Sequence, residues 1–167
     1  MPRHRPFRRL SRGQKAQVAL SLALATDSEL LILDDPTLGL DAVARRSILE
    51  ELVDELAGGG RTILITTHDL AGIEGLADRV AFLKEGRLIL DEPLERLKER
   101  FRLLRWQEGE GPAGELTVVQ RREGPWGQEA VVSDFTEGWG QEGCEVSALS
   151  LEEIFVALGG GEQEVPS

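Results

Sequence analysis

Two adjacent aspartates, Asp34 and Asp35, close an apolar run that spans residues 30–33. Such a run is typical of a strand buried on both faces of a parallel sheet. Ligands of open α/β sheets bind at the carboxyl ends of the strands, where an aspartate can hold Mg²⁺ against nucleotide phosphates. The pattern is short, however, and an aspartate that only caps or turns the chain after a strand explains it about equally well.

Two further segments could take part in chemistry. His68 follows a second apolar strand, residues 62–66, although a lone histidine is more often a structural hydrogen-bonding residue than a catalytic one. The turn Ser11-Arg12-Gly13-Gln14 has the S-x-x-Q form of a capping box at the start of a helix. A helix N-terminus with free amides, a hydroxyl and a glycine is also a phosphate site.

The elements that position these residues alternate between helix and strand. Apolar spacing predicts helices over residues 12–25, 42–57, 70–77 and 94–101, and strands over residues 30–33, 62–66, 80–83 and 87–90. Asp41 and Asp69 are expected to cap the helices that follow them. Gly86 is expected in the tight turn of a hairpin. The alternation predicts an α/β sheet with one antiparallel hairpin.

The composition changes from about Arg105 onwards. Gly109, Gly111, Pro112 and Gly114 form a linker-like stretch, and short strands are expected over residues 116–119 and 130–132, followed by a helix over 151–158 and a loose glycine tail over 159–161. Residues 105–167 contain three arginines and thirteen acidic residues. We therefore expect a first domain over residues 1–104 and an acidic extension over 105–167, which is a small α+β appendage or partly disordered.

The overall composition restricts the class of protein. No apolar run approaches the roughly 18 residues of a membrane span, and neither a signal peptide nor a disulfide framework is expected, because Cys144 is the single cysteine. Residues 1–15 hold six basic residues and no acid, but the net charge of −11 argues against nucleic-acid binding. We expect a cytoplasmic protein.

Four segments, in their order and spacing, resemble the motifs of ABC transporter ATPases. Residues 10–14 are similar to the signature motif, residues 30–35 to the Walker B strand, residues 37–41 to the D-loop and residues 66–69 to the switch-histidine loop. The resemblance covers roughly residues 7–104 and implies the C-terminal portion of a P-loop NTPase sheet with flanking helices. A weaker likeness of residues 151–158 points to ATPases of the ABC-2 class of exporters.

The resemblance implies that part of the chain contacts nucleotide across a dimer. Ser11 and Gly13 would contact the γ-phosphate of ATP held on a second ATPase subunit. Arg12 and Gln14 belong to the same nucleotide-binding turn. Asp41 would couple the two sites across the dimer.

The remaining motif residues would serve hydrolysis itself. Asp34 would hold Mg²⁺ through water, Asp35 would polarise the attacking water, and His68 would reach the γ-phosphate. The family usually has glutamate at the position of Asp35. The aspartate carboxylate retreats by on the order of 1 Å, and a misplacement of that size can cost about 10²-fold in rate.

A second departure is the phosphate-binding loop, because no G-x-x-x-x-G-K-[ST] occurs in the sequence. We therefore expect a partial ATPase subunit that is inactive alone and that uses ATP and Mg²⁺ only in a complete assembly. Its expected partners are a membrane subunit of an ABC transporter, which provides its only link to the membrane, and a second ATPase subunit or a second copy of itself.

Two other hypotheses belong to different classes. A non-catalytic interaction or regulatory protein could reuse the same half-domain as a dimerisation surface. A DNA-repair ATPase of the same superfamily would need long coiled-coil heptads, which the sequence does not contain.

Overall fold

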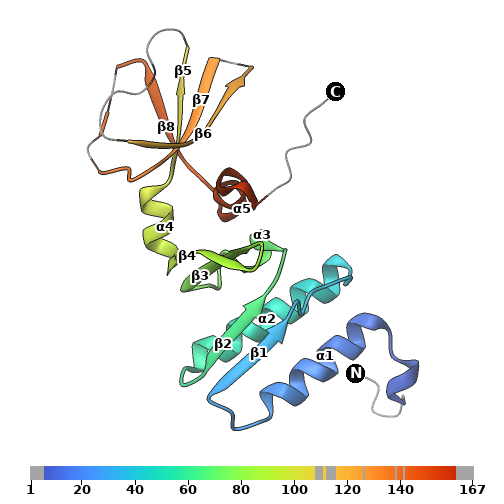
Figure 1. Cartoon of the computed structure of the whole chain (residues 1–167). Coiled ribbons are helices and arrows are strands. Elements are labelled where there is room, and N and C mark those ends of the chain that lie inside the picture. The colour runs from blue at the N-terminus through green and yellow to red at the C-terminus, as the bar shows by residue number, and fades with distance from the viewer. Residues whose placement is uncertain are drawn as a thin grey trace. The chain divides into compact units, whose positions relative to one another are not determined.

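The computed structural model describes residues 6–107, 111, 116–125, 127–137, 139–140 and 142–160. The chain forms two compact units, residues 1–73 and 74–167 (Figure 1). The boundary between the units along the chain therefore follows residue 73, whereas the composition of the sequence changes near residue 105.

The first unit contains two long helices and two strands. Its elements are the 3-10 helix η1 (Phe7–Arg9), α1 (Arg12–Leu24), β1 (Leu30–Asp34), α2 (Ala42–Gly58), β2 (Thr62–Thr66) and the short α3 (Leu70–Ile73). Strands β1 and β2 pair in parallel, from Leu30 opposite Thr62 to Asp34 opposite Thr66. The helix α2 connects them, so the parallel arrangement expected from the alternation of helices and strands is confirmed.

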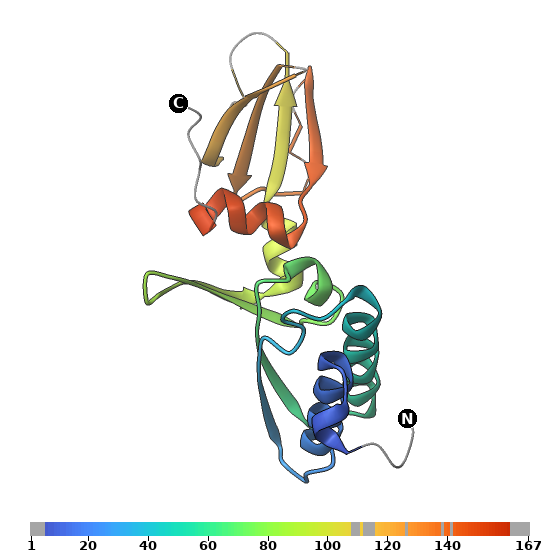
Figure 2. The same ribbon diagram turned by 90° about the vertical axis from the view of Figure 1, so that its right-hand side faces the viewer.

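Both long helices lie on the same side of the β1–β2 pair (Figure 2). Their apolar positions and the inward residues of the strands form one core. Its buried members are Leu20, Leu40, Ile48 and Leu52, and the partly buried Leu24, Leu33, Ile63 and Ile65 pack against them. Because side chains alternate across a strand, only every second residue of β1 and β2 reaches this core.

The opposite face of the strand pair is exposed in this unit. Leu30, Ile32 and Leu64 are 49%, 63% and 54% exposed. The expectation that the apolar run of residues 30–33 is buried on both faces is therefore wrong for the described structure. A continuous apolar run requires cover on two sides, and here α1 and α2 both cover one side.

The second unit begins with a hairpin and ends in a small helix. Its elements are β3 (Arg79–Lys84), β4 (Arg87–Pro93), α4 (Leu94–Arg100), β5 (Arg102–Trp106), β6 (Thr117–Gly124), β7 (Gly127–Ser133), β8 (Cys144–Ala148), α5 (Leu151–Phe155) and the π-helical turn η2 (Val156–Gly160). Strands β3 and β4 are antiparallel. Glu85 and Gly86 form the hairpin turn with φ of 50° and 74°, so glycine occupies the tight position as expected.

The other four strands of this unit form an antiparallel sheet in the order β6-β7-β5-β8. On one face of the sheet Leu104, Trp106, Ala130 and Val132 form a buried cluster. Leu103 and Val131, which alternate with them, are also buried, so β5 and β7 are covered on both faces. The helix α5 adjoins one end of this sheet (Figure 1). Phe155 packs edge-on against Phe82 of β3 with ring centres 5.0 Å apart.

The described residues of the expected extension thus form strands and a short helix, with β6 and β7 longer than the short strands predicted. Gly159, with φ of 81°, leaves the helical conformation inside η2. Gly109, Pro112 and Gly114 of the expected linker, and Gly161, lie outside the described residues. Within the described ranges, no helix combines the length and the apolar character that crossing a membrane requires.

Candidate functional site at the carboxyl ends of β1 and β2

The parallel register places the last residues of the two strands side by side. Asp34 is opposite Thr66, and the Thr66 hydroxyl donates a hydrogen bond to Oδ1 of Asp34. Among the described residues Oδ2 of Asp34 has no hydrogen-bond partner, and the residue is exposed. One carboxylate oxygen is therefore oriented by the neighbouring strand while the other remains accessible.

The next residue, Asp35, turns sharply out of β1. Its φ is 42°, in the left-handed region that a non-glycine residue adopts only at a cost and that aspartate tolerates better than most. The backbone N–H of Asp35 donates to the Thr66 carbonyl at 2.8 Å. This hydrogen bond extends the pairing by one residue and holds Asp35 in the turn.

The side chain of Asp35 meets the predicted histidine. Its Oδ2 lies 2.6 Å from Nδ1 of His68, and the Thr67 hydroxyl lies 3.5 Å from Oδ1. The Asp35 side chain is 19% exposed and the His68 side chain 71% exposed. The two residues predicted to be catalytic are therefore in contact, with the carboxylate sheltered and the imidazole accessible to solvent.

Asp69 has the structural role expected from the sequence. Its Oδ1 accepts a hydrogen bond from the Gly72 N–H at 3.3 Å, which caps α3. Its Oδ2 lies 3.1 Å from Nη1 of Arg45, an ion pair without hydrogen-bond alignment. This pair joins the residue after His68 to α2.

The turn of residues 11–14 is a capping box, as predicted. Ser11 Oγ accepts a hydrogen bond from the Gln14 N–H at 3.2 Å, and Gln14 Oε1 accepts one from the Ser11 N–H at 3.1 Å. The polar groups of these two residues therefore satisfy each other at the start of α1. Ser11 is nevertheless exposed, so its hydroxyl remains accessible.

The same turn packs against the segment that leads into α2. A β-carbon on Gly13 would lie only 2.6 Å from Cβ of Ala44, so this glycine permits a close approach of the two helices. The guanidinium of Arg12 lies against Gly39. Asp41 caps α2, as expected, by accepting a hydrogen bond from the Ala44 N–H at 2.8 Å. The structure thus brings together residues 11–14 and 39–44.

Sequence reasoning did not assign roles to Thr66 and Thr67, although their hydroxyls contact the two aspartates. The signal was present in the two sequences Asp34-Asp35 and Thr66-Thr67. Each pair ends a predicted strand, and neighbouring parallel strands bring such ends to the same edge of the sheet.

The arrangement fits a Mg²⁺ ion that is shared with a nucleotide better than an ion held by protein alone. No group of three or more histidine, cysteine, aspartate or glutamate residues that could hold a metal occurs in the described part of the chain. Mg²⁺ beside nucleotide phosphates needs only one or two carboxylates, because phosphate oxygens and water complete its coordination. The accessible oxygen of Asp34 can serve as one such ligand.

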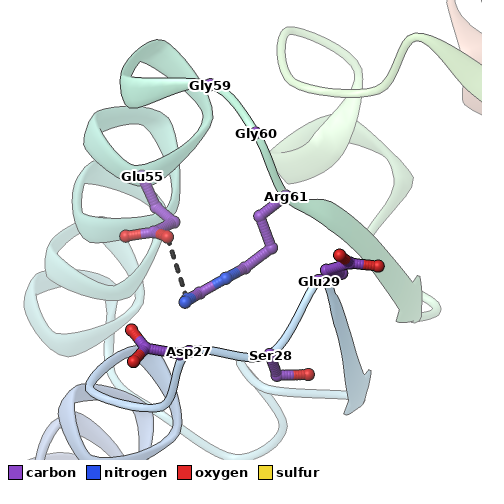
Figure 3. A pocket seen from close by; sticks show the side chains of 7 residues that line it. All are labelled: Asp27, Ser28, Glu29, Glu55, Gly59, Gly60 and Arg61. Atoms are coloured by element: carbon purple, nitrogen blue, oxygen red, sulfur yellow. Dashed lines mark ion pairs between the residues drawn. The ribbon is translucent and has the colours of Figure 1, made fainter.

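A shallow, open pocket lies at the other end of the strands (Figure 3). It has a volume of about 210 Å³ and is lined by residues 27–29, 55 and 59–61. Arg61 pairs there with Glu55 at 2.9 Å and donates to the Leu24 carbonyl at 3.2 Å. Arg61 thus satisfies a free carbonyl at the C-terminal end of α1. This pocket is separate from Asp34, Asp35 and His68.

Comparisons with known proteins agree with the motifs. A family model described as "AAA domain, putative AbiEii toxin, Type IV TA system" matches residues 3–73. The chain is 41% identical over 101 residues to the ABC transporter ATP-binding protein YtrB of Bacillus subtilis, covering 60% of this chain and 35% of YtrB. It is 42% identical over 111 residues to the fluoroquinolones export ATP-binding protein MT2762 of Mycobacterium tuberculosis, covering 66% of this chain and 36% of that protein.

A third relative is the lantibiotic transport ATP-binding protein SrtF of Streptococcus pyogenes, which is 37% identical over 100 residues, 58% of this chain and 43% of SrtF. The matches to these curated relatives thus span only 35% to 43% of the relatives' own length.

Proposed function

We propose that this chain corresponds to part of an ABC transporter ATP-binding subunit. It would supply an ATPase with the hydrolytic residues at the carboxyl ends of β1 and β2 and with the signature turn, residues 11–14. In the proposed assembly ATP hydrolysis drives transport through a membrane subunit. The chain acts on the cytoplasmic face of the membrane and is attached to it through that subunit. The observation that carries the proposal is the contact between Asp35 and His68 at the carboxyl edge of β1 and β2.

Asp35 and His68 would act as one unit in the hydrolysis step. The Asp35 carboxylate would accept a hydrogen bond from the attacking water and direct it. His68 lies within hydrogen-bond distance of the carboxylate and is exposed, so its ring can also reach toward a phosphate. Thr67, which contacts the same carboxylate, would keep Asp35 oriented when His68 turns toward the nucleotide.

Asp34 would be the protein's contribution to the metal site. A Mg²⁺ ion bound there would neutralise charge on the β- and γ-phosphates. The Thr66 hydroxyl, which donates to one oxygen of Asp34, fixes the carboxylate so that its other oxygen faces outward. The Asp35 side chain contacts His68 instead, so the two carboxylates would have separate roles.

The signature turn would act on nucleotide bound elsewhere. Ser11 and Gly13, with Arg12 and Gln14 beside them, lie at the N-terminus of the 13-residue helix α1, whose dipole and first N–H groups favour an anion. We infer that they would contact the γ-phosphate of ATP on a second ATPase subunit or a second copy of the chain. Asp41, which fixes the start of α2, would couple the two sites.

A chimera can test this proposal, because the sequence itself contains no phosphate-binding loop of the G-x-x-x-x-G-K-[ST] type. The matching segment of this chain would replace the 101 matched residues of YtrB. We expect the chimera to hydrolyse ATP, and Asp35→Asn or His68→Ala to reduce the rate at least about 10²-fold. The matched control is Arg46→Ala, which removes an exposed helix-surface pair with Glu50.

A folded chimera that binds Mg-ATP and whose hydrolysis ignores both substitutions would contradict the assignment. The second candidate, a non-catalytic interaction protein, is favoured by one observation, the bare apolar face of Leu30, Ile32 and Leu64. In that case the chain would associate with other polypeptides through this face, and neither Asp35 nor His68 would affect the interaction.

A further inference from the structure

We propose that Arg12 is a positioning residue that holds the loop of residues 37–41 against the first turn of α1. The inference rests on the proposed function, in which this loop and the signature turn act together across a dimer interface. It gives Arg12 a role that acts through Gly39, in addition to any contact with nucleotide.

The geometry of Gly39 carries the proposal. A β-carbon built on Gly39 would lie 2.5 Å from Nη1, 2.6 Å from Cζ and 2.8 Å from Nη2 of Arg12. Three atoms of the planar guanidinium are therefore almost equally close to this point. The guanidinium therefore occupies the space that any other residue would need for its side chain.

The loop itself leaves Gly39 in need of such support. Its two turns are closed by hydrogen bonds from the Leu38 N–H to the Asp35 carbonyl at 3.0 Å and from the Leu40 N–H to the Thr37 carbonyl at 3.2 Å. Thr37 and Leu40 are buried, which anchors both sides of the apex. Gly39 lies between them and is exposed, with φ of 66°, and the guanidinium lies beside it.

The contact also explains how Arg12 is oriented. In the described part of the structure the Arg12 guanidinium makes neither a hydrogen bond nor an ion pair, and the residue is exposed. Long arginine side chains at such positions are usually mobile. In our proposal the contact with Gly39 restrains the side chain, and the guanidinium in turn restrains the loop. A lysine cannot do the same, because an ammonium group lacks the planar surface.

The loop ends at Asp41, so its conformation has a consequence for the proposed coupling. Asp41 caps α2 through the Ala44 N–H, and Ala44 is the residue that Gly13 touches. Arg12 and Gly13, which are neighbours in the signature turn, therefore contact the loop and the helix after it at two separate points. Loss of the first contact would release the apex of the loop while the second still holds the helices together.

The test uses the 167-residue chain and amide exchange and ¹⁵N relaxation measured by NMR. We expect Arg12→Ala and Arg12→Lys to increase amide exchange at Leu38 and Leu40, whose N–H groups close the two turns of the loop, by about tenfold, and to lower the order parameter of Gly39 below about 0.6 from the roughly 0.85 of rigid backbone. The Gln14 amide, which is bonded to Ser11 Oγ, should keep its protection. Arg9→Ala, which changes a neighbouring exposed arginine, is the control and should leave Gly39 unaffected.

A double-mutant cycle with Gly39→Ala gives an independent readout. If the guanidinium occupies the space beside Gly39, a methyl group there must displace it, and the substitution should be less destabilising in the Arg12→Ala background than in the wild type. Unchanged Gly39 dynamics in Arg12→Ala would overturn the proposal, as would Gly39→Ala being equally destabilising in both backgrounds. Either result leaves the hydrolysis test of Asp35 and His68 unaffected, so the two inferences fail separately.

Discussion

Gly13 and Ala44 are packed so closely that a β-carbon on Gly13 would lie 2.6 Å from Cβ of Ala44. Real β-carbons do not approach one another to this distance, so α1 and α2 can adopt their spacing only with glycine at residue 13. One turn further along, Gln17 Nε2 donates to Ser47 Oγ at 2.6 Å and holds the same two helices together. A glycine that the motif assigns to phosphate contact is thus also required by helix packing.

We predict that Gly13→Ala lowers the free energy of unfolding by about 1–3 kcal/mol, the usual cost of overpacking. Adding Ala44→Gly should recover part of this loss, because it removes the atom that the new methyl group meets. The control is Gly58→Ala, since no atom lies within 4 Å of the position of its β-carbon. Urea denaturation measures all four chains, and equal stability of Gly13→Ala and wild type would refute the packing argument.

The second prediction concerns nucleotide binding by the chain alone. The groups that we propose to contact phosphate are those of the signature turn and of the carboxyl ends of β1 and β2, and the sequence contains no phosphate-binding loop motif. We expect the 167-residue chain to bind Mg-ATP no more tightly than about 1 mM. Titration calorimetry gives the answer directly, and a micromolar dissociation constant would mean that the chain has a nucleotide site of its own.

The third prediction concerns the bare face of the first unit, which consists of Leu30, Ile32 and Leu64. Exposed apolar faces and unpaired strand edges favour pairing with another chain. We expect the chain to form a dimer or larger assembly at tens of micromolar, and Ile32→Lys to shift it toward monomer. Val43→Lys is the control, because Val43 is an exposed apolar residue on α2 and not on the sheet.

Light scattering coupled to size-exclusion chromatography measures the oligomeric state of the wild-type chain and of both variants. A monodisperse 18.3 kDa species for the wild-type chain, with a sharp thermal transition, would contradict the prediction. Equal effects of the two lysine substitutions would show that the strand face is not the contact surface.

The alternation of apolar runs and breakers predicts the first unit's two long helices, its parallel strand pair and the caps at Ser11 and Asp41, whereas α3 is shorter than the helix expected over residues 70–77. These features depend on local spacing, which a single sequence contains. The exposure of Leu30 and Ile32 was not predictable, because burial depends on what covers the strand, and that is a property of distant segments. The contact between Asp35 and His68 was implied only by the shared strand edge.

The packing of Gly13 and of Gly39 could not be read from the sequence either. A glycine in a motif indicates a need for space or for positive φ, but the atom that takes the space comes from residues far along the chain. Arg12 lies 27 positions before Gly39, and Ala44 lies in a different helix from Gly13. Only the arrangement of α1 and α2 relates these residues to one another.

The second unit contains a carboxylate that joins several of its elements. Glu74 accepts hydrogen bonds from Nζ of Lys98 on α4 and from the Leu151 N–H at the start of α5, the latter at 3.1 Å. The hydrogen bond from Lys98 holds the pKa of Glu74 below its ordinary value, and that from Leu151 acts in the same direction against the effect of burial. Glu129 has a lowered pKa as well, because Arg105 and Arg122 both donate to it.

The fourth prediction is therefore a loss of stability in acid. A carboxylate whose pKa is lower in the folded state contributes stability above its unfolded pKa, and this contribution is lost as the pH falls through the folded pKa. The second unit should weaken below about pH 4.5, the ordinary glutamate value. We expect Glu74→Gln to reduce this pH dependence and Glu74→Ala to cost about 1–2 kcal/mol at pH 7.

Urea unfolding at pH 7 and at pH 3.5 separates these effects. Glu95→Gln on α4 is the control, because that carboxylate shows neither an ion pair nor a hydrogen bond within the described structure. The same pH dependence in Glu74→Gln and wild type would mean that Glu74 is not among the groups responsible.

We propose that Asp35, in contact with His68, directs the water that attacks ATP. Aspartate is one methylene shorter than the glutamate that the resemblance leads us to expect, and a retreat of about 1 Å can cost about 10²-fold in rate. Measured by single-turnover hydrolysis in the YtrB chimera, Asp35→Glu should raise the rate by about 10- to 100-fold while Asp35→Asn nearly abolishes it. Equal rates for the wild-type, glutamate and asparagine chimeras, all folded and all binding Mg-ATP, would contradict the claim.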